Sequence, residues 1–376
     1  MVDTSRNCKM LCEISNINYG TRVVKSKVEG DEYPVYGGGG ETFRINKFNR
    51  ENCVIVSRFA MSPKCTRYVK KKIFLNDSGL TVSTKDNSLL LQEYLNWYLL
   101  SMNDEIYSLG RGAGQRNLEI PSFKRMLISY PVDLDEQQKI VSILDKADEI
   151  RTKKKQANEK LDEFLKSTFV DMFGDPVNNT KNYPVQNIAS FAKVKIGPFG
   201  NSLHKEEYIT DGIPLVNPSQ IVDEKIVFDS SVSITEKKYK ELQAYWLQKD
   251  DIIIGRRGEI GRAAVVSNNV RCICGTGSLF IRINKPVIQP LILQKIISSN
   301  TMKEKLLNNS VGVTMNNLNA GIIENLGIAI PPIEHQNKFA QIVKKVEEQK
   351  QRNEKVIEQM DNLFNSLSQR AFKGEL

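Results

Sequence analysis

Apolar residues at heptad spacing mark two long stretches of the chain. In the first stretch, the two apolar heptad positions are occupied by Ile140, Ala147 and Leu161, and by Ile143, Ile150, Ala157 and Phe164. In the second stretch they are occupied by Phe339, Val346, Met360 and Leu367, and by Ile342, Val356 and Leu363. A repeat of 3.5 residues is typical of a coiled-coil seam. The pattern therefore predicts two long helices that pair along these lines.

The two stretches are copies of each other. Residues 128–173 and 328–372 align at a constant offset of 199 once one residue is deleted near the start. Under this offset Lys154 meets Asn353, and both are polar residues at seam positions. A polar seam residue commonly fixes the register of a coiled coil, so we expect these two side chains to form a polar layer. The alternative is an amphipathic helix packed on its own domain. Against it, about 38 residues form a rod of about 57 Å, longer than a small domain needs.

The segments that precede the two helices also share an order of elements. CVIVSRFA at 53–60 corresponds to DIIIGRRGEIGRAAVV at 251–266, and LNDSGLTVST at 75–84 corresponds to CGTGSLFIRI at 274–283. Helices are predicted near 89–102 and 291–298, and a GxxxxNL pattern follows at 112–118 and 312–318. The four glycines at 37–40 are not followed by Lys-Ser or Lys-Thr, so we expect a flexible loop there and not a phosphate loop.

This internal repeat predicts an α+β fold with pseudo-two-fold symmetry. Two globular mixed α/β domains are joined by two long coiled-coil helices. The second helix must run back along the first, so the pair is antiparallel. The expected segments are 1–132 (first domain), 133–175 (first helix), 176–332 (second domain) and 333–376 (second helix).

The net charge of +9 is concentrated in the globular segments. Residues 1–132 carry 19 Lys and Arg against 13 Asp and Glu, and residues 176–332 carry 18 against 13. The first helix segment has 8 against 11, and the second has 8 against 7. Basic globular domains point to a polyanion, most simply nucleic acid. A generally basic protein without such a partner is the alternative.

The remaining composition argues against a metal site, a membrane span and catalysis. The six cysteines form no CxxC pair, and His204 and His335 are not at metal-ligand spacing to them, so free thiols in a reducing compartment are expected. No apolar run approaches the 18 or so residues of a membrane span, which favours a cytoplasmic protein. There is no ATP-binding loop and no adenine-methyltransferase [DN]PP[YF] motif. Asp211, Asp223 and Lys225 only faintly match a nuclease pattern.

Four motifs together resemble the specificity subunit of a type I restriction–modification system. They are LDEQQKIVSILDKAD at 134–148, FLKSTFVDMFGDP at 164–176, GRRGEIGRAAVV at 255–266, and the GxxxxNL pair. The resemblance covers the whole chain. It differs from the family at 57–68, where SRFAMSPKCTRY replaces a Gly-Arg-Lys-Gly type of loop.

The resemblance implies a non-catalytic subunit in which each globular domain reads one half of a split, asymmetric target in double-stranded DNA. The helices would act as a ruler and as the dock for two methylation subunits, in a complex that also holds restriction subunits. S-adenosylmethionine, ATP and Mg²⁺ would be bound by those partners and not by this chain. The helix residues concerned are Ile140, Ile143, Lys154, Leu161, Phe339, Ile342, Asn353 and Met360. A standalone nuclease, a coiled-coil adaptor without a DNA role, and the specificity partner of a fused restriction–methylation enzyme are the alternatives.

Candidate DNA contacts lie on the two matching pairs of loops. Arg256 and Arg257 follow a strand in a glycine-rich loop, and arginine can donate two hydrogen bonds to guanine. Because phosphate contacts usually outnumber base contacts, several candidates would only position the protein. The full set is Arg58, Lys64, Arg67, Arg111, Gln115 and Arg116 in the first domain, and Arg256, Arg257, Arg262, Thr314, Asn316 and Asn317 in the second.

Overall fold

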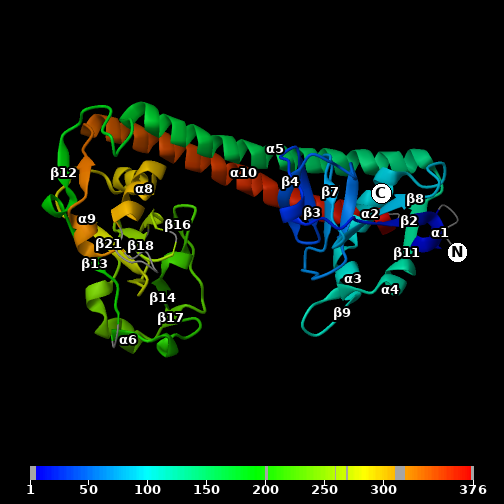
Figure 1. Cartoon of the computed structure of the whole chain (residues 1–376), viewed down its shortest axis with the longest axis horizontal. Coiled ribbons are helices and arrows are strands. Elements are labelled where there is room, and N and C mark those ends of the chain that lie inside the picture. The colour runs from blue at the N-terminus through cyan, green and yellow to red at the C-terminus, as the bar shows by residue number, and fades with distance from the viewer. Residues whose placement is uncertain (1–5, 200–201, 259, 268–269, 310–317, 374–376) are drawn as a thin grey trace. The chain divides into compact units, whose positions relative to one another are not determined.

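The chain forms two compact units, each built from one globular domain and parts of two long helices (Figure 1). The computed structural model describes residues 6–199, 202–258, 260–267, 270–309 and 318–373. Unit 1 comprises Met1–Glu159 and Gln351–Leu376, and unit 2 comprises Lys160–Lys350. The long helices α5 (Leu134–Phe173) and α10 (Ile333–Lys373) each contribute to both units, so the two predicted long helices are present.

An antiparallel sheet and a mixed sheet form the centre of unit 1. The four-stranded sheet has the order β2 (Ser15–Tyr19), β8 (Gly79–Thr84), β5 (Cys53–Ser57), β6 (Thr66–Val69), with antiparallel neighbours throughout. The three-stranded sheet has the order β4 (Gly40–Ile45), β3 (Tyr33–Gly37), β7 (Phe74–Leu75). β3 and β7 are parallel, and all five residues of β5 are buried. β5 therefore forms the middle of the core, as its apolar run predicts.

Helices cover the sheet of unit 1 and close its core. Tyr94 and Trp97 of α2 are buried against the strands and against the ends of α5 and α10 in this unit. The remaining elements are α1 (Leu11–Ile14), η1 (Lys25–Lys27), α2 (Gln92–Ser101), α3 (Asn103–Ser108), α4 (Ile120–Lys124) and the strand pairs β1 (Arg6–Met10) with β11 (Leu127–Pro131) and β9 (Gly110–Arg111) with β10 (Asn117–Leu118). The sequence analysis missed β1 and β2, whose residues are largely polar, and α1, which is a single turn of four residues.

Unit 2 repeats the architecture of unit 1. Its four-stranded sheet has the order β13 (Ala192–Ile196), β21 (Ser278–Ile283), β18 (Ile252–Gly255), β19 (Ala263–Val265), and its three-stranded sheet has the order β17 (Ser233–Ile234), β14 (Ile213–Val216), β20 (Ile273–Cys274). The pair β14–β20 is parallel, as is its counterpart β3–β7. The other elements are β12 (Val185–Asn187), β22 (Gly327–Ala329), β15 (Ile221–Val222), β16 (Lys225–Ile226), α6 (Glu236–Glu241), α7 (Pro290–Ser298), α8 (Asn300–Asn309), α9 (Ala320–Glu324), η2 (Ile188–Ser190), η4 (Lys205–Glu207), η5 (Pro218–Gln220) and η6 (Gln243–Tyr245). The predicted internal repeat is confirmed at the level of strand pairing.

The two long helices are antiparallel in both units, as predicted. In unit 1, Arg151 of α5 pairs with Asp361 of α10 at 3.1 Å. In unit 2, Lys350 of α10 pairs with Asp162 of α5 at 2.7 Å. From Arg151 to Asp162 along α5, the partner on α10 changes from Asp361 to Lys350. The two helices therefore run in opposite directions. The predicted polar layer is also present in unit 1, where Asn353 is buried and donates to Asn158 Oδ1 at 2.7 Å.

One of the two predicted seam lines is wrong. The first line is correct, since it faces the partner helix or the core; it runs through Ile140, Ala147, Lys154 and Leu161. On this line, Lys154 Nζ donates to Asn353 Oδ1 at 3.5 Å. The second line was placed one residue too early. Ile143 and Phe164 are 41% and 49% exposed, whereas the next residues, Leu144 and Leu165, are buried. The same shift holds on α10, where Leu363 is exposed and Phe364 is buried.

All six cysteines are free, and four of them are buried: Cys53, Cys65, Cys272 and Cys274. Burial raises the pKa of Cys53 and Cys65 to about 11 and that of Cys272 to about 12, and it raises the pKa of Cys274 as well. A raised pKa lowers the thiolate fraction, so at pH 8 only about one in a thousand molecules carries a reactive Cys53.

We therefore expect a thiol reagent at pH 8 to label Cys8 and Cys12 of the folded chain and to reach all six thiols only after unfolding. Cys8 and Cys12 are exposed. Mass spectrometry of the labelled protein measures the number of modified thiols. The Cys8→Ser/Cys12→Ser double variant is the control, and fast labelling of that folded variant would contradict the buried positions.

Among the residues that the structure describes, no three His, Cys, Asp or Glu side chains are grouped so that they could hold a metal ion. Within the same ranges, none of the helices has the length and the apolar composition that crossing a membrane requires.

Candidate nucleic-acid interface

Two loops that are far apart in the sequence of unit 1 form one surface. The loop after β5 is joined to the segment of β10 by three hydrogen bonds that involve its backbone. Leu118 N donates to Arg58 O at 2.9 Å, Met61 N donates to Arg116 O at 2.8 Å, and Ala60 N donates to Asn117 Oδ1 at 3.2 Å. The first two groups of predicted contact residues, 58–67 and 111–116, therefore lie side by side.

The same junction occurs in unit 2. Leu318 N donates to Arg256 O at 3.0 Å, the counterpart of the bond between Leu118 and Arg58. The loops also share a backbone conformation, since Ala60 has a φ of 48° and Gly258 a φ of 73°. This left-handed turn suits glycine and is uncommon for alanine. The repeat thus builds the same loop scaffold twice and places different side chains on it.

Arg58 lies between two exposed aromatic side chains in unit 1. Its guanidinium carbon is 4.9 Å from the centre of the Tyr19 ring and 4.5 Å from that of the Phe59 ring. Tyr19 ends β2 and is 43% exposed, and Phe59 follows Arg58 and is 38% exposed. Sequence analysis missed both rings. An aromatic residue directly beside an arginine at the end of a strand was the available signal.

Arg256 does not have the base-reading role that the sequence suggested. It is only 8% exposed, and its Nε donates to Leu318 O at 3.2 Å. Burial lowers its pKa, and the neighbouring positive charge of Arg257 lowers it further. A side chain that is enclosed in this way supports the loop and cannot reach a base. The sequence could not show which of two adjacent arginines points inward.

Arg257 is the exposed member of the pair. It lines a cavity of about 380 Å³ together with Tyr208, Asn217, Ser219 and Thr276. Asn217 Oδ1 accepts a hydrogen bond from Gly277 N at 3.4 Å, which joins the two walls of the cavity. Arginine, tyrosine and hydroxyl groups around one concave surface can all contact phosphate or base edges.

The other predicted residues of unit 1 differ in how exposed they are and in which contacts their side chains make within the unit. Lys64 is exposed, and Arg111 is exposed and lies 3.6 Å from Glu119. Gln115 is exposed and donates to Asn117 Oδ1 at 3.4 Å. Arg116 donates to Gly110 O at 3.2 Å and stacks on the ring of Tyr107. Arg116 therefore holds its own loop in shape.

Arg67 supports the glycine-rich stretch, which is a hairpin turn and not the flexible loop that we expected. β3 and β4 pair as Gly37 with Gly40, and Arg67 donates to Gly38 O. Ser57 Oγ donates to the same oxygen at 2.7 Å, while Gly38 N donates to Ser78 Oγ at 2.9 Å. A Cβ on Gly38 would lie 3.1 Å from Ser57 Cβ, so this close approach favours glycine.

The remaining predictions fall on unit 2. Arg262 is half-buried, and Thr314, Asn316 and Asn317 lie outside the described residues. The faint nuclease pattern does not form a site. Asp211 and Asp223 have φ values of 58° and 47°, and Lys225 pairs with Glu347 at 3.2 Å. They are turn and surface residues in the structure.

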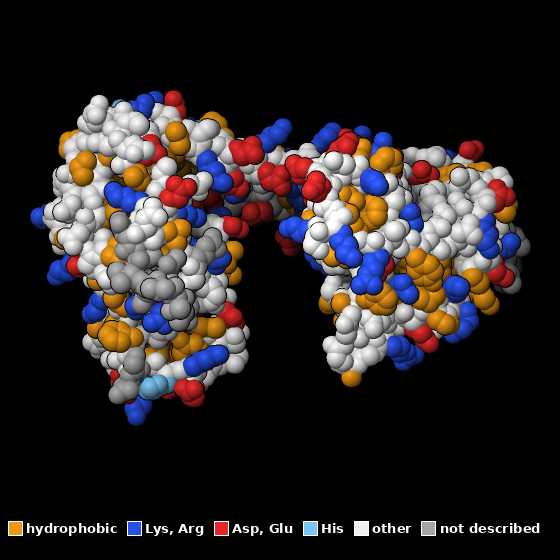
Figure 2. All heavy atoms as spheres, in the orientation of Figure 1, with side chains coloured by type: hydrophobic (Ala, Val, Ile, Leu, Met, Phe, Trp, Pro, Cys, Tyr) orange, Lys and Arg blue, Asp and Glu red, His pale blue; other side chains and the backbone are white. Residues whose placement is uncertain are grey.

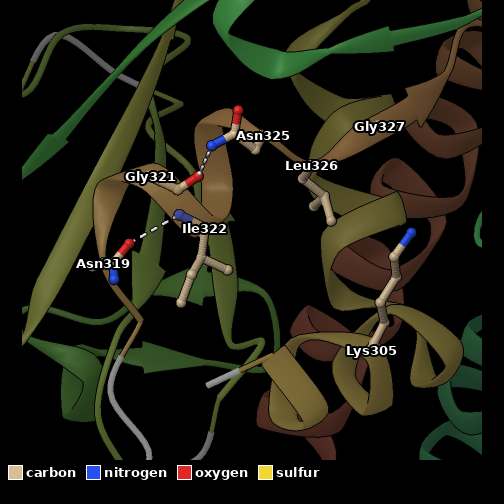
Figure 3. A pocket seen from close by; sticks show the side chains of 7 residues that line it. All are labelled: Lys305, Asn319, Gly321, Ile322, Asn325, Leu326 and Gly327. Carbon is tan, nitrogen blue, oxygen red and sulfur yellow. Dashed lines mark hydrogen bonds between the residues drawn. The ribbon is translucent and has the colours of Figure 1, made fainter. Parts of the chain in front are cut away.

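A second cavity in unit 2, of about 410 Å³, lies beside α9 (Figure 3). Asn319 Oδ1 accepts a hydrogen bond from Ile322 N at 2.9 Å, and Asn325 Nδ2 donates to Gly321 O at 2.9 Å. Both amides are thus used within the α9 turn. Lys305 supplies the charge among the seven lining residues, which include no carboxylate, imidazole or thiol. Apart from Lys305, this lining has no group for acid–base or nucleophilic chemistry.

Charge is distributed unevenly over the visible face of the molecule. Figure 2 shows both Asp and Glu and Lys and Arg side chains on the long helices, and Lys and Arg side chains among hydrophobic ones on the globular parts. The excess of Lys and Arg over Asp and Glu in the two globular segments favours a polyanion there more than along the helices.

Two copies of one mixed α/β domain, each followed by a long helix, define a class of internally repeated, two-domain proteins. The family model for the type I restriction modification DNA specificity domain matches residues 8–163 and 181–360, and the chain belongs to this family. The expected family and the predicted α+β fold with two antiparallel helices are confirmed.

Individual relatives agree with this assignment. The chain is 27% identical over 176 residues to the type I restriction enzyme EcoBI specificity subunit of Escherichia coli, a match that covers 45% of this chain and 36% of that protein. It is 24% identical over 326 residues to the MjaIX specificity subunit of Methanocaldococcus jannaschii, which covers 82% of this chain and 74% of that protein.

Solved structures share the fold at low sequence identity. The S subunit of a type I restriction-modification system from M. genitalium gives a TM-score of 0.57 at 17% identity, over 99% of this chain and 97% of that one. A chain from a structure of type I R-M complex assembly and conformational transition also gives 0.57, at 15% identity and full coverage of both chains.

Proposed function

We propose that this chain is the DNA-specificity subunit of a type I restriction–modification complex, and that each unit reads one half of a split, asymmetric target. One observation carries the proposal. The two units present the same loop scaffold, anchored by Leu118 N to Arg58 O and by Leu318 N to Arg256 O, but expose different side chains on it. Two domains that share a backbone conformation but expose different side chains can bind two half-sites of different sequence.

The partners of such a subunit are methylation and restriction subunits, and the long helices are the surface we propose for docking two methylation subunits. Ile140, Phe339 and Asn353 are buried within their own units and cannot contact a partner. Ile143 and Phe164 are exposed apolar side chains on α5, which an interface would cover. In this arrangement S-adenosylmethionine, ATP and Mg²⁺ bind to the partners, and this chain is non-catalytic.

Methylome sequencing tests the proposal. The chain is co-expressed with its own methylation subunit in cells without other methyltransferases, and assembly of the complex is verified by co-purification. The expected result is methyladenine in a motif with two different halves separated by an unspecified spacer. Exchanging the globular part of one unit for that of another family member should change one half only.

The alternatives give different results in the same experiment. A complex that assembles and leaves no new methylated motif would contradict the proposal and favour an adaptor without a DNA role. Metal-dependent cleavage of DNA by the purified chain, lost in Asp223→Ala, would indicate a nuclease.

A further inference from the structure

Arg58 has donors that the rest of unit 1 does not use. Among the residues that the structure describes, none accepts a hydrogen bond from its guanidinium, and its side chain is held only by the rings of Tyr19 and Phe59. The two neighbouring arginines behave differently. Arg50 donates to Thr81 Oγ1, Asn49 O and Tyr19 O, and Arg67 donates to Gly38 O.

We infer that Arg58 reads a guanine in the half-site of unit 1 and that Tyr19 and Phe59 position it for this contact. The inference rests on the proposed function and deepens it. The guanidinium carbon lies 4.9 and 4.5 Å from the two ring centres, and the side chain is half-buried, so the rings restrict its movement while its N–H donors have no acceptor among the described residues. One edge of a guanidinium carries two parallel N–H donors, which match the O6 and N7 acceptors of guanine in the major groove.

The backbone around Arg58 is fixed as well. Arg58 N donates to Ser78 O at 2.8 Å, and Arg58 O accepts from Leu118 N at 2.9 Å. Tyr19 is tied to the sheet because its carbonyl accepts from Arg50 Nη2 at 2.9 Å. An arginine whose backbone and rotamer are already held loses less conformational entropy when it binds. More of the energy of the contact is then available to favour guanine over the other bases.

A phosphate contact would leave a different structure. Flexible, solvated side chains such as Lys64 suffice to neutralise a phosphate, and the direction of the donors is less important there. A guanidinium in contact with two aromatic rings has fewer orientations than a solvated one, which suits the fixed direction of a planar base edge. The exposed parts of the rings can also cover apolar parts of neighbouring bases. These properties favour base reading over a phosphate contact.

The repeat makes the inference specific to unit 1. Arg256 occupies the equivalent position in unit 2, but it is buried and donates to Leu318 O. The exposed arginine of that loop is Arg257, one residue later, beside the cavity formed with Asn217. The two units therefore present an arginine from different points of the same scaffold, and a substitution at Arg58 should affect one half-site only.

The test uses the full chain in complex with its methylation subunits and a duplex that carries the methylome-defined target. Each guanine of the unit 1 half-site is replaced in turn by 7-deazaguanine, which lacks the N7 acceptor. Dissociation constants are measured for the wild type, Arg58→Ala and Arg58→Lys. We expect Arg58→Ala to weaken binding about 10- to 100-fold, the range for a two-donor arginine–guanine contact. At one guanine, 7-deazaguanine should weaken the wild type several-fold and leave Arg58→Ala unchanged.

The lysine variant separates a base contact from a phosphate contact, because it keeps the charge but loses the planar pair of donors. It should lose discrimination at the same guanine. Phe59→Leu should weaken binding at that guanine less than Arg58→Ala does, whereas Phe48→Leu, another exposed aromatic of unit 1, should have no effect. Arg125→Ala removes an exposed charge from the residue that follows α4 and controls for net charge. Unchanged thermal unfolding of each variant confirms that it is folded.

Three results would each overturn the inference. In the first, Arg58→Ala weakens binding to unrelated DNA by the same factor, which is the behaviour of a phosphate contact. In the second, Arg58→Ala binds the target as tightly as the wild type does. In the third, every 7-deazaguanine affects both proteins equally. If the wild-type complex itself prefers no target, the proposed function fails before the inference is reached.

Discussion

Replacing Phe339 with alanine is expected to lower the free energy of unfolding of unit 2 by about 3–5 kcal/mol. Phe339 is fully buried, and its ring centre lies 5.4 Å from those of both Phe169 and Phe173. Alanine would leave a cavity between α10 and α5 and would remove two edge-to-face ring contacts. Denaturant unfolding of the full chain, with hydrogen exchange to assign the transition to unit 2, measures the loss.

Phe164→Ala is the matched control, because it makes the same chemical change on the partner helix of the same unit. Phe164 is 49% exposed, so its replacement should change the free energy of unfolding by no more than about 0.5 kcal/mol. The heptad pattern in the sequence put Phe164 on the seam. Equal losses from the two substitutions would mean that α5 is rotated toward the predicted seam and would contradict the structure.

The seam shows how far a periodic pattern can be interpreted. The spacing predicted the two helices, their antiparallel pairing and one seam line. For the second line it selected Ile143, Ala157 and Phe164, because the true line has polar residues in the middle. Arg151 belongs to that true line, where it pairs with Asp361 and its guanidinium carbon lies 5.4 Å from the ring centre of Phe364. Asn158 accepts from Asn353. These polar residues find partners on α10, which a hydrophobic pattern cannot reveal.

In the globular domains, too, the sequence predicted the apolar elements and missed the polar ones. The buried strands β5 and β18 were predicted because all their residues are apolar or small, while β1 and β2 were missed because most of their residues are polar. The loops of the interface were predicted, but the directions of their side chains were not. Arg58 and Arg256 have equivalent backbone bonds, yet Arg58 is half-buried and Arg256 is buried, a difference that only the packing around each decides.

Replacing Gln137 with leucine is expected to lower the free energy of unfolding of unit 1 by about 3 kcal/mol, because three backbone groups lose their partner in one buried and two part-buried hydrogen bonds, and a buried group left unpaired costs roughly 1–3 kcal/mol. Gln137 is fully buried. Its Nε2 donates to Leu89 O at 3.0 Å and to Pro131 O at 2.8 Å, and its Oε1 accepts from Leu91 N at 2.9 Å. Leucine has a similar volume and helix propensity, so the loss reports the hydrogen bonds.

Gln336→Leu should have a similar effect on unit 2, since Gln336 makes the same set of bonds. Its Nε2 donates to Pro331 O at 2.8 Å and to Val287 O at 3.2 Å, and its Oε1 accepts from Gln289 N at 2.8 Å. Each glutamine thus ties the first turns of a long helix to the loop before α2 or α7.

The exposed residues Gln138 and Gln341 provide matched controls, and leucine at either position should change the free energy of unfolding by no more than about 0.5 kcal/mol. Thermal and denaturant unfolding of the four variants, with hydrogen exchange to assign each transition, gives the comparison. A full-size loss in one unit without a loss in the other would show that the two junctions are energetically different despite identical bonding. Because the two glutamines are related by the offset of 199, equal losses would show that the repeat conserves the energetics of the helix junction as well as its geometry.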